Sequence, residues 1–190
     1  MCSSHDTRPR AYQMQDSGNC YKARLAIAHQ QLPCEMVPID ILTGESRTPA
    51  FLVRNSNGRV PTLELTDGTF LPESNAIPWY LAEDTILMTG DPLSRAQALR
   101  WMFFEQYSHE PFIATIRFWL ALAPDPESHR VQIDERRPGG YAALDVMEQH
   151  LGAHDFFAGD YSIADIALYA YTHVAEEGDF DLSGYPRIHD

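Results

Sequence analysis

Apolar positions in the first third of the chain change their spacing from one segment to the next, which is typical of alternating strands and helices. Residues 10–14 form a short segment that suits a strand. From Cys20, apolar side chains recur at helical spacing until Pro33, where proline ends the predicted helix. Residues 34–39 predict a second strand, and Pro38 places it at a sheet edge because proline cannot donate a ladder hydrogen bond.

A hairpin and a third helix are expected next. Asp67-Gly68 separates two short apolar segments, and this dipeptide is a strong hairpin signal. A short helix precedes the hairpin near residues 50–53, and Ser74 stands where it can cap a helix after it. The order of these elements predicts an α/β N-terminal domain over residues 1–83, with a mixed four-stranded sheet in a thioredoxin-like arrangement.

The rest of the chain shows no convincing strand pattern. Asp91-Pro92 combines an N-cap residue with proline at the first helical position and starts a long helical pattern. The expected helices run from 92 towards Pro111, over 112–123, over 141–151 and onward from Ser162. We therefore expect a linker at residues 84–90 and an all-α C-terminal domain over residues 91–190.

The composition describes a globular chain whose surface is acidic. Its 190 residues are 44% hydrophobic and 11% aromatic, which is enough for two small cores. The formal net charge is −13, and residues 85–190 hold 17 acidic but only 7 basic side chains, which disfavours a nucleic-acid partner. We find no membrane-spanning apolar run, no secretion signal and no zinc-type histidine spacing, and only three cysteines. We expect a soluble cytoplasmic protein without a metal, a membrane contact or a disulfide framework.

Four motifs follow one another along the chain. They are Ser17-Gly18-Asn19-Cys20 at the first strand-to-helix turn, Val60-Pro61 before the third strand, Glu73-Ser74 at the third helix, and the capping box Ser162-Ile163-Ala164-Asp165 in the helical half. In this order and at these spacings the chain resembles the cytosolic glutathione transferases, in particular serine-type, theta-like bacterial members. The resemblance covers roughly residues 10–189. It implies a detoxifying homodimeric enzyme with glutathione as co-substrate and a small electrophile as partner.

Glutathione is a small acidic peptide, and the expected site has a group for each of its parts. Val60, before a cis Pro61, is expected to pair with the peptide backbone as one added strand residue does. Ser74 at a helix start offers a hydroxyl and N–H donors to the γ-glutamyl carboxylate, and Glu73 can accept from the γ-glutamyl ammonium.

The chemistry depends on stabilising the glutathione thiolate. Lowering a thiol pKa by about two units takes roughly 2.7 kcal/mol of preferential thiolate binding. The resemblance assigns the hydroxyl donor to Ser17, with Asn19 as a second donor to the sulfur. Cys20 is the competing candidate, since a cysteine-type enzyme forms a mixed disulfide and acts as a reductase. Tyr12 and Tyr21 rank last, because a tyrosine-type enzyme places its phenol at the end of the first strand, where this chain has Met14-Gln15-Asp16.

Further contacts are expected at the other ends of the two substrates. Arg47 or Arg59 is expected to meet the glycyl carboxylate, in keeping with the basic residues that the family uses in these stretches. The second substrate is expected to be apolar and to lie against the helical domain. The residues expected to contact it are Trp101, Glu105, His109 and Phe112.

Two features depart from the family pattern. Pro78 removes a main-chain donor from the first turn after Ser74, which should tighten or shift that turn. Family members continue past the position of Asp190, so we expect a truncated C-terminus. Two other functions stay open at this point: a non-catalytic binding module of the same fold, and a glutathione disulfide reductase that depends on Cys20.

Overall fold

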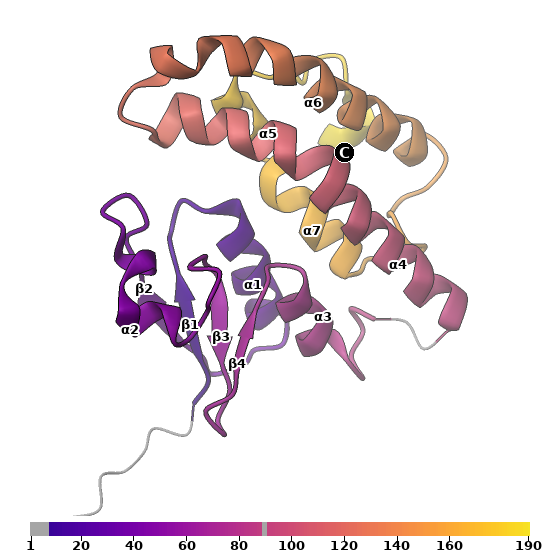
Figure 1. Ribbon diagram of the computed structural model, residues 1–190. Coiled ribbons are helices and arrows are strands. Elements are labelled where there is room, and N and C mark those ends of the chain that lie inside the picture. The colour runs from indigo at the N-terminus through magenta and orange to yellow at the C-terminus, as the bar shows by residue number, and fades with distance from the viewer. Residues whose placement is uncertain (1–7, 89–90) are drawn as a thin grey trace, which may run out of the picture. The chain divides into compact units, whose positions relative to one another are not determined.

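The computed structural model describes residues 8–88 and 91–190. Its internal contacts divide the chain into two compact units, Met1–Glu83 and Asp84–Asp190. The first unit combines a sheet with helices, and the second is helical (Figure 1).

The first unit is built on a mixed four-stranded sheet. Its strands are β1 Arg10–Gln13, β2 Glu35–Pro38, β3 Thr62–Glu64 and β4 Phe70–Pro72. They lie in the order β2-β1-β3-β4; β1 and β2 are parallel, and β3 is antiparallel to both β1 and β4. The predicted α/β thioredoxin-like class is confirmed, and β2, which ends in Pro38, is an edge strand as expected.

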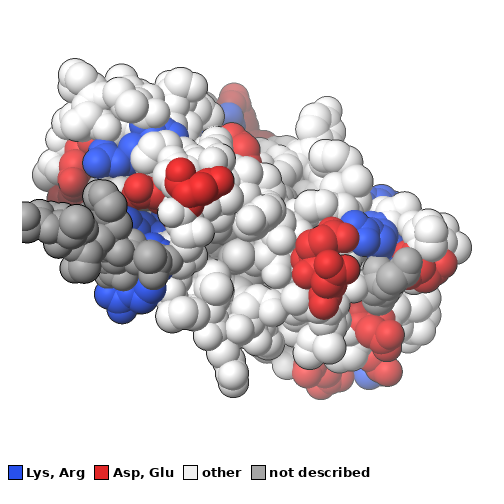
Figure 2. Space-filling view, turned by 90° about the horizontal axis from the view of Figure 1, so that it is seen from below, with Lys and Arg blue, Asp and Glu red and all other residues white. Residues whose placement is uncertain are grey.

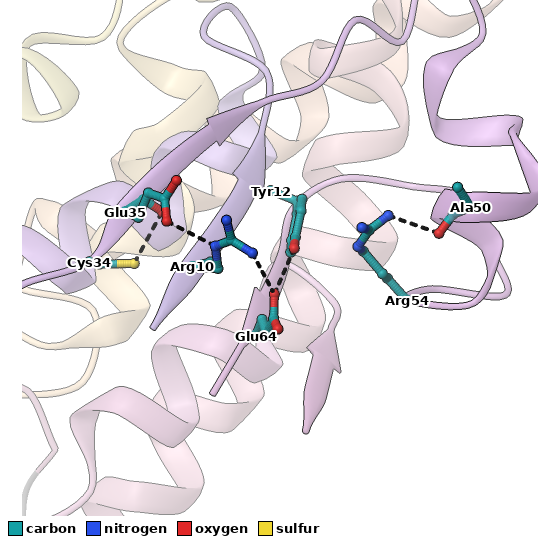
Figure 3. Close-up of polar contacts among 7 residues, drawn as sticks. All are labelled: Arg10, Tyr12, Cys34, Glu35, Ala50, Arg54 and Glu64. Atoms are coloured by element: carbon teal, nitrogen blue, oxygen red, sulfur yellow. Dashed lines mark hydrogen bonds and ion pairs between the residues drawn. The ribbon is translucent and has the colours of Figure 1, made fainter. Parts of the chain in front are cut away.

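Charged side chains join three of these strands on one face of the sheet (Figure 3). Arg10 lies opposite Glu35 on β2 and opposite Glu64 on β3. Its Nε is 2.8 Å from the Glu35 carboxylate, and its Nη1 is 3.9 Å from that of Glu64. The hydroxyl of Tyr12 donates to Glu64 at 2.6 Å. Directly opposed charges of unlike sign favour this register over one shifted by a residue.

The two faces of the sheet carry different helices because successive strand residues point to opposite sides. Ala11 and Leu63 pack with residues of α1 Gly18–His29 and α3 Ala76–Ala82 in one core. Tyr12 instead packs with Phe51 of the short helix α2 Pro49–Leu52.

The third helix begins later than expected. Ser74 is not its N-cap: Asn75 is, and the helix starts at Ala76 and has only seven residues. Pro78, which lacks an N–H, falls in the first turn, where helix donors have no intrahelical partner in any case. The proline is thus accommodated by a shifted start and not by a distorted turn.

The second unit contains a longer continuous helical segment than its prolines suggest. The segment consists of α4 Pro92–Phe104, η2 Glu105–His109, α5 Glu110–Arg117 and η3 Phe118–Leu122. We expected a break at Pro111, and that prediction was wrong. The turn η2 is a π-helix, in which the Glu110 N–H bonds to the Glu105 C=O five residues earlier. Such a widened turn admits a proline that lacks the next donor.

The next helix, α6 Arg130–Leu151, begins eleven residues before the expected start at 141. Pro138, Gly139 and Gly140 concealed it, because proline and glycine disfavour helix interiors. Both glycines have a packing reason. A Cβ on Gly139 would lie 2.5 Å from the Phe112 ring, and one on Gly140 would lie 2.4 Å from the Phe180 ring. These glycines therefore let two aromatic rings pack directly against the α6 backbone.

The last long helix, α7 Ile163–Thr172, starts with the predicted capping box. The Ser162 hydroxyl accepts from the Ala164 N–H, while the Asp165 carboxylate accepts from the main-chain N–H groups of Ser162 and Phe157. Burial raises the pKa of Asp165, and these donors oppose the shift. Three shorter segments, η4 Pro126–His129, η5 Ala175–Gly178 and α8 Pro186–His189, complete the unit.

The surface charge and the lengths of the helices concern two partners that the sequence disfavours, a nucleic acid and a membrane. In the view of Figure 2, blue basic side chains lie beside red acidic ones over the described residues and do not form one continuous basic surface. Within residues 8–88 and 91–190, no helix is both long enough and apolar enough to cross a membrane.

Candidate functional site

Strand directions bring three of the predicted motifs to one end of the sheet. Because β3 runs antiparallel to β1, with Thr62 opposite Tyr12, Val60-Pro61 precedes β3 at the end where β1 leaves the sheet. β4 is antiparallel to β3, with Pro72 opposite Thr62, so Glu73-Ser74 leave the sheet at the same end. The loop with Ser17, the Val60-Pro61 loop and the Glu73-Ser74 loop are therefore neighbours.

Ser17 is the N-cap of α1. Its main chain is extended, and its hydroxyl oxygen accepts from the Cys20 N–H at 3.3 Å. Accepting this bond leaves the hydroxyl hydrogen as a donor. Ser17 is half-buried, so a bound group can reach it. The arrangement joins a hydroxyl donor to the positive end of a twelve-residue helix.

Cys20 lies on the inner side of the same turn. Its side chain is fully buried, and its sulfur accepts from the Met14 N–H at 3.3 Å. Burial raises the pKa of the Cys20 thiol, and the hydrogen bonds of Ser17 and Met14 oppose the shift only in part. A buried thiol with a raised pKa is a poor nucleophile. This geometry counts against the Cys20-dependent reductase.

Arg24 holds the loop that carries Ser17. Its guanidinium donates to the Gln13 side chain at 2.6 Å and to the carbonyl oxygens of Met14 and Gln15 at 3.2 and 2.8 Å. Sequence reasoning missed this residue, and no motif marks it. Its role follows only from the tertiary arrangement, in which α1 passes beside the end of β1.

The Val60–Pro61 peptide bond is cis, the isomer that the resemblance implies. Over the described part of the chain, neither the N–H nor the C=O of Val60 makes a hydrogen bond. The preceding loop is held by the buried Asn55, which accepts from the Asn57 N–H and donates to the Arg59 carbonyl and the Thr62 hydroxyl. Asn55 is a second residue that sequence reasoning missed.

Ser74 is buried and makes two side-chain hydrogen bonds to α1. Its hydroxyl donates to Asn19 Oδ1 at 3.0 Å, and its oxygen accepts from Lys22 Nζ at 3.3 Å. The structure thus brings the predicted residues Asn19 and Ser74 into direct contact. Lys22 was missed, although one signal could have found it: it is the only lysine in the chain.

The remaining predicted groups of the first unit are exposed. Glu73 has a positive φ of 80°, a left-handed conformation uncommon outside glycine, at the point where the chain turns from β4 towards α3. Arg47 donates from Nη1 to the Asn57 carbonyl at 2.8 Å. The Arg59 side chain makes no hydrogen bond or ion pair with any described residue. Both arginines keep donors that a carboxylate can use.

The residues expected to contact the second substrate are largely buried. Trp101 packs against the rings of Phe104, His150 and Phe157, and among the described residues its indole N–H has no hydrogen-bond partner. Phe112 is half-buried and packs against Gly139. The structure places both aromatic rings in the packing of the helical unit, and contact of either ring with a second substrate stays a prediction.

Glu105 and His109 are fully buried in or beside the π-helical turn. His109 Nε2 is 2.9 Å from the Thr172 hydroxyl, which donates to the Leu168 carbonyl at 2.7 Å. Because the hydroxyl hydrogen is used there, Thr172 accepts from His109, and Nε2 carries a hydrogen. Contact of these groups with a second substrate stays a prediction.

Both parts of the chain match known domain families. The glutathione S-transferase N-terminal domain matches residues 12–85, and the glutathione S-transferase C-terminal domain matches residues 109–190. A maleylacetoacetate isomerase from Pseudomonas aeruginosa is 31% identical over an alignment that covers 94% of this chain and 87% of that protein.

Solved structures give the same relationship. A glutathione S-transferase from Pseudomonas fluorescens is 50% identical, with a TM-score of 0.93, over 95% of this chain and 90% of that one. A glutathione transferase from Pseudomonas putida, solved with one glutathione disulfide bound per subunit, is 26% identical with a TM-score of 0.85, over 98% of this chain and 86% of that one.

Proposed function

The chain belongs to the glutathione S-transferase family, and we propose that it binds glutathione at the Ser17, Val60 and Ser74 end of its sheet and activates the thiol for attack on an electrophile. The observation that carries the proposal is the convergence of three loops, each with a different donor or acceptor, at that end.

Val60 supplies the main-chain contact. An extended peptide can pair with the free N–H and C=O of a single residue as a neighbouring strand does, and glutathione has a cysteinyl residue at its centre. Pairing there directs the cysteinyl side chain consistently, because both hydrogen bonds fix the orientation of the same residue. The cis bond to Pro61 lies directly after this pair of groups.

Ser17 supplies the thiolate contact. Its hydroxyl donates to the glutathione sulfur, and Asn19 adds a second donor near the start of α1. A hydrogen bond to a charged group contributes about 1.5–3 kcal/mol, so one such bond accounts for a thiol pKa lowered by one to two units. The proton leaves to solvent on binding. The thiolate then attacks the electrophilic carbon and forms the carbon–sulfur bond as the leaving group departs.

The ends of the peptide carry its charges. Ser74 receives the γ-glutamyl carboxylate, and Glu73 accepts from the γ-glutamyl ammonium. Arg47 or Arg59, both exposed and with donors available, pairs with the glycyl carboxylate. We further propose an apolar second substrate, contacts to it from Trp101, Glu105, His109 and Phe112, a homodimer, and a detoxifying role in the cytoplasm; these follow from the family resemblance.

Ultraviolet absorbance of bound glutathione against pH tests the role of Ser17. In the wild type we expect the thiolate band to appear at a pH at least one unit below that of free glutathione. Ser17→Ala should move the titration most of the way back. Ser56→Ala removes an exposed serine from the same unit and serves as the control. An identical thiol pKa in Ser17→Ala and the wild type would remove Ser17 from the mechanism.

The relative named maleylacetoacetate isomerase supports a second candidate reaction. The thiolate would add to a conjugated double bond, rotation about the resulting single bond would follow, and the thiolate would leave again. Glutathione is not consumed in that sequence, whereas a transferase consumes one glutathione per product. Counting free thiol during turnover on a cis-unsaturated dicarbonyl separates the two reactions.

A further inference from the structure

Lys22 has an unusual position for its residue type. It is the only lysine in the 190 residues, and its side chain has 0% exposure. Lysine is almost never fully buried unless it is paired, because removing an ammonium from water costs several kcal/mol. Lys22 Nζ points at the Ser74 hydroxyl oxygen, 3.3 Å away. A charge at the surface would need no explanation, but the Lys22 ammonium is buried and contacts Ser74, which we propose binds the ligand.

The hydrogen bonds of this cluster have only one consistent direction. An ammonium carries donors and no acceptor, so Lys22 donates to Ser74. The Ser74 hydroxyl therefore gives its own hydrogen to Asn19 Oδ1 at 3.0 Å. Asn19 and Lys22 lie three residues apart on α1 and face the same side, so both reach Ser74 from one helix surface. A hydroxyl that accepts from a cation is a stronger donor to its next partner.

We propose that Lys22 is a positioning residue, which acts through Ser74 to make this site select thiol peptides with a free α-carboxylate on the γ-glutamyl end. The inference rests on the proposed function, in which Ser74 receives this carboxylate, and adds the residue on which the selection depends. In the free protein, Asn19 Oδ1 occupies the place of a carboxylate oxygen. On binding, the ligand carboxylate takes the Ser74 hydrogen bond and Asn19 is released. The positive charge on Lys22 favours the ionised ligand carboxylate over the neutral amide oxygen of Asn19 as the acceptor of the Ser74 hydrogen bond.

A ligand that lacks only this carboxylate tests the inference. In 4-aminobutyryl-cysteinyl-glycine, a hydrogen replaces the α-carboxylate and the rest of glutathione is kept. We expect the wild type to bind this analogue at least about tenfold more weakly than glutathione, the range of a charge-assisted hydrogen bond. In Lys22→Met, which keeps the length of the buried stem, the two ligands should bind within about threefold of each other. Calorimetry of the four combinations measures this coupling.

The outcomes separate the two proposals. If the wild type does not bind glutathione, the proposed function fails. If the wild type binds glutathione and Lys22→Met still prefers it over the analogue by the wild-type factor, only the role of Lys22 is overturned. Asn19→Asp places a carboxylate on Ser74 permanently, and we expect it to weaken glutathione binding more than Asn19→Ala does. Equal weakening by these two variants would contradict the placeholder role of Asn19.

A second measurement decides the matter if Lys22→Met does not fold. Since the chain has one lysine, protein labelled with ¹³C at lysine Cε gives a single lysine signal, which comes from Lys22. We expect saturating glutathione to shift this signal and saturating 4-aminobutyryl-cysteinyl-glycine to leave it near its free position. A signal that moves equally with both ligands would overturn the inference.

Discussion

Asn55 offers the sharpest test of how the site is held, because it makes no proposed contact with a ligand. Its side chain lies in the loop before Val60 and is only 5% exposed. It accepts from the Asn57 N–H at 3.0 Å and donates to the Arg59 carbonyl at 2.8 Å and to the Thr62 hydroxyl at 3.2 Å. Asn55→Ala removes all three bonds together.

The expected cost follows from these bonds. Each contributes about 1 kcal/mol, so their loss destabilises the native state by about 3 kcal/mol. The Arg59 carbonyl keeps a weaker bond from the Thr62 hydroxyl at 3.3 Å, which limits the loss there. The Asn57 N–H has no other acceptor among the described residues and keeps only water. Because Val60 follows directly, we also expect weaker glutathione binding.

Urea denaturation, with and without glutathione, measures both effects. Asn57→Ala is a matched control, since it removes the same kind of amide from an exposed position in the same loop. We expect it to change the free energy of unfolding by less than about 0.5 kcal/mol. If Asn55→Ala and Asn57→Ala unfold at the same urea concentration, the loop is not held by Asn55. If Asn55→Ala is destabilised yet binds glutathione as tightly as the wild type, the loop does not position Val60.

Three further predictions concern other groups. Cys20, whose pKa burial raises, should react with a thiol reagent at least about tenfold more slowly in native protein than in urea, as followed by mass spectrometry; native reaction at the denatured rate would contradict its burial. Asp165→Asn puts an NH₂ against a main-chain N–H at the α7 cap and should cost about 2 kcal/mol in thermal unfolding, more than Ser162→Ala; an unchanged midpoint would refute this. Burial and the bond to Asp145 raise the pKa of Tyr185 to about 12, so its neutral form favours folding below pH ~10 and that contribution is lost as the pH rises towards 12. The tyrosinate absorbance of wild type minus Tyr185→Phe should therefore rise near pH 12, and a rise near pH 10 would contradict it.

The fold could be predicted wherever one local signal had one structural meaning. Pro38 marked an edge strand, Asp67-Gly68 marked a hairpin, and the Ser162 capping box marked a helix start. The wrong predictions of helix bounds concern residues whose local sequence is compatible with two different structures. Pro111 predicts a break in the helix, but a π-helical turn accommodates this proline. The Gly139 and Gly140 pair lowers helix propensity, yet the same absence of side chains lets two rings pack on α6, and that gain is visible only in three dimensions.

The sequence predicted the groups that we propose to contact a ligand, and it did not predict the residues that hold the loops of these groups. The family resemblance assigned roles to Ser17, Val60 and Ser74, and the chemistry of a peptide thiol gives each of them a matching group. No motif marks Arg24 or Lys22. Arg24 holds the loop after β1, and Lys22 contacts Ser74 before α3, so each role depends on which segments the fold brings next to α1. One feature of the sequence points weakly to this arrangement: the chain has thirteen arginines but a single lysine.

The first turn of α1 separates two kinds of chemistry that sequence alone left open. Ser17 and Cys20 are three residues apart and hydrogen-bonded to each other, but the sulfur faces inward while the hydroxyl is half-exposed. The Met14 N–H already serves the buried sulfur, whose raised pKa disfavours a thiolate. The exposed side of the turn offers the Ser17 hydroxyl as a hydrogen-bond donor, while the Cys20 sulfur is buried on the other side. This geometry supports the proposal that the reacting thiol comes from a bound ligand and not from Cys20.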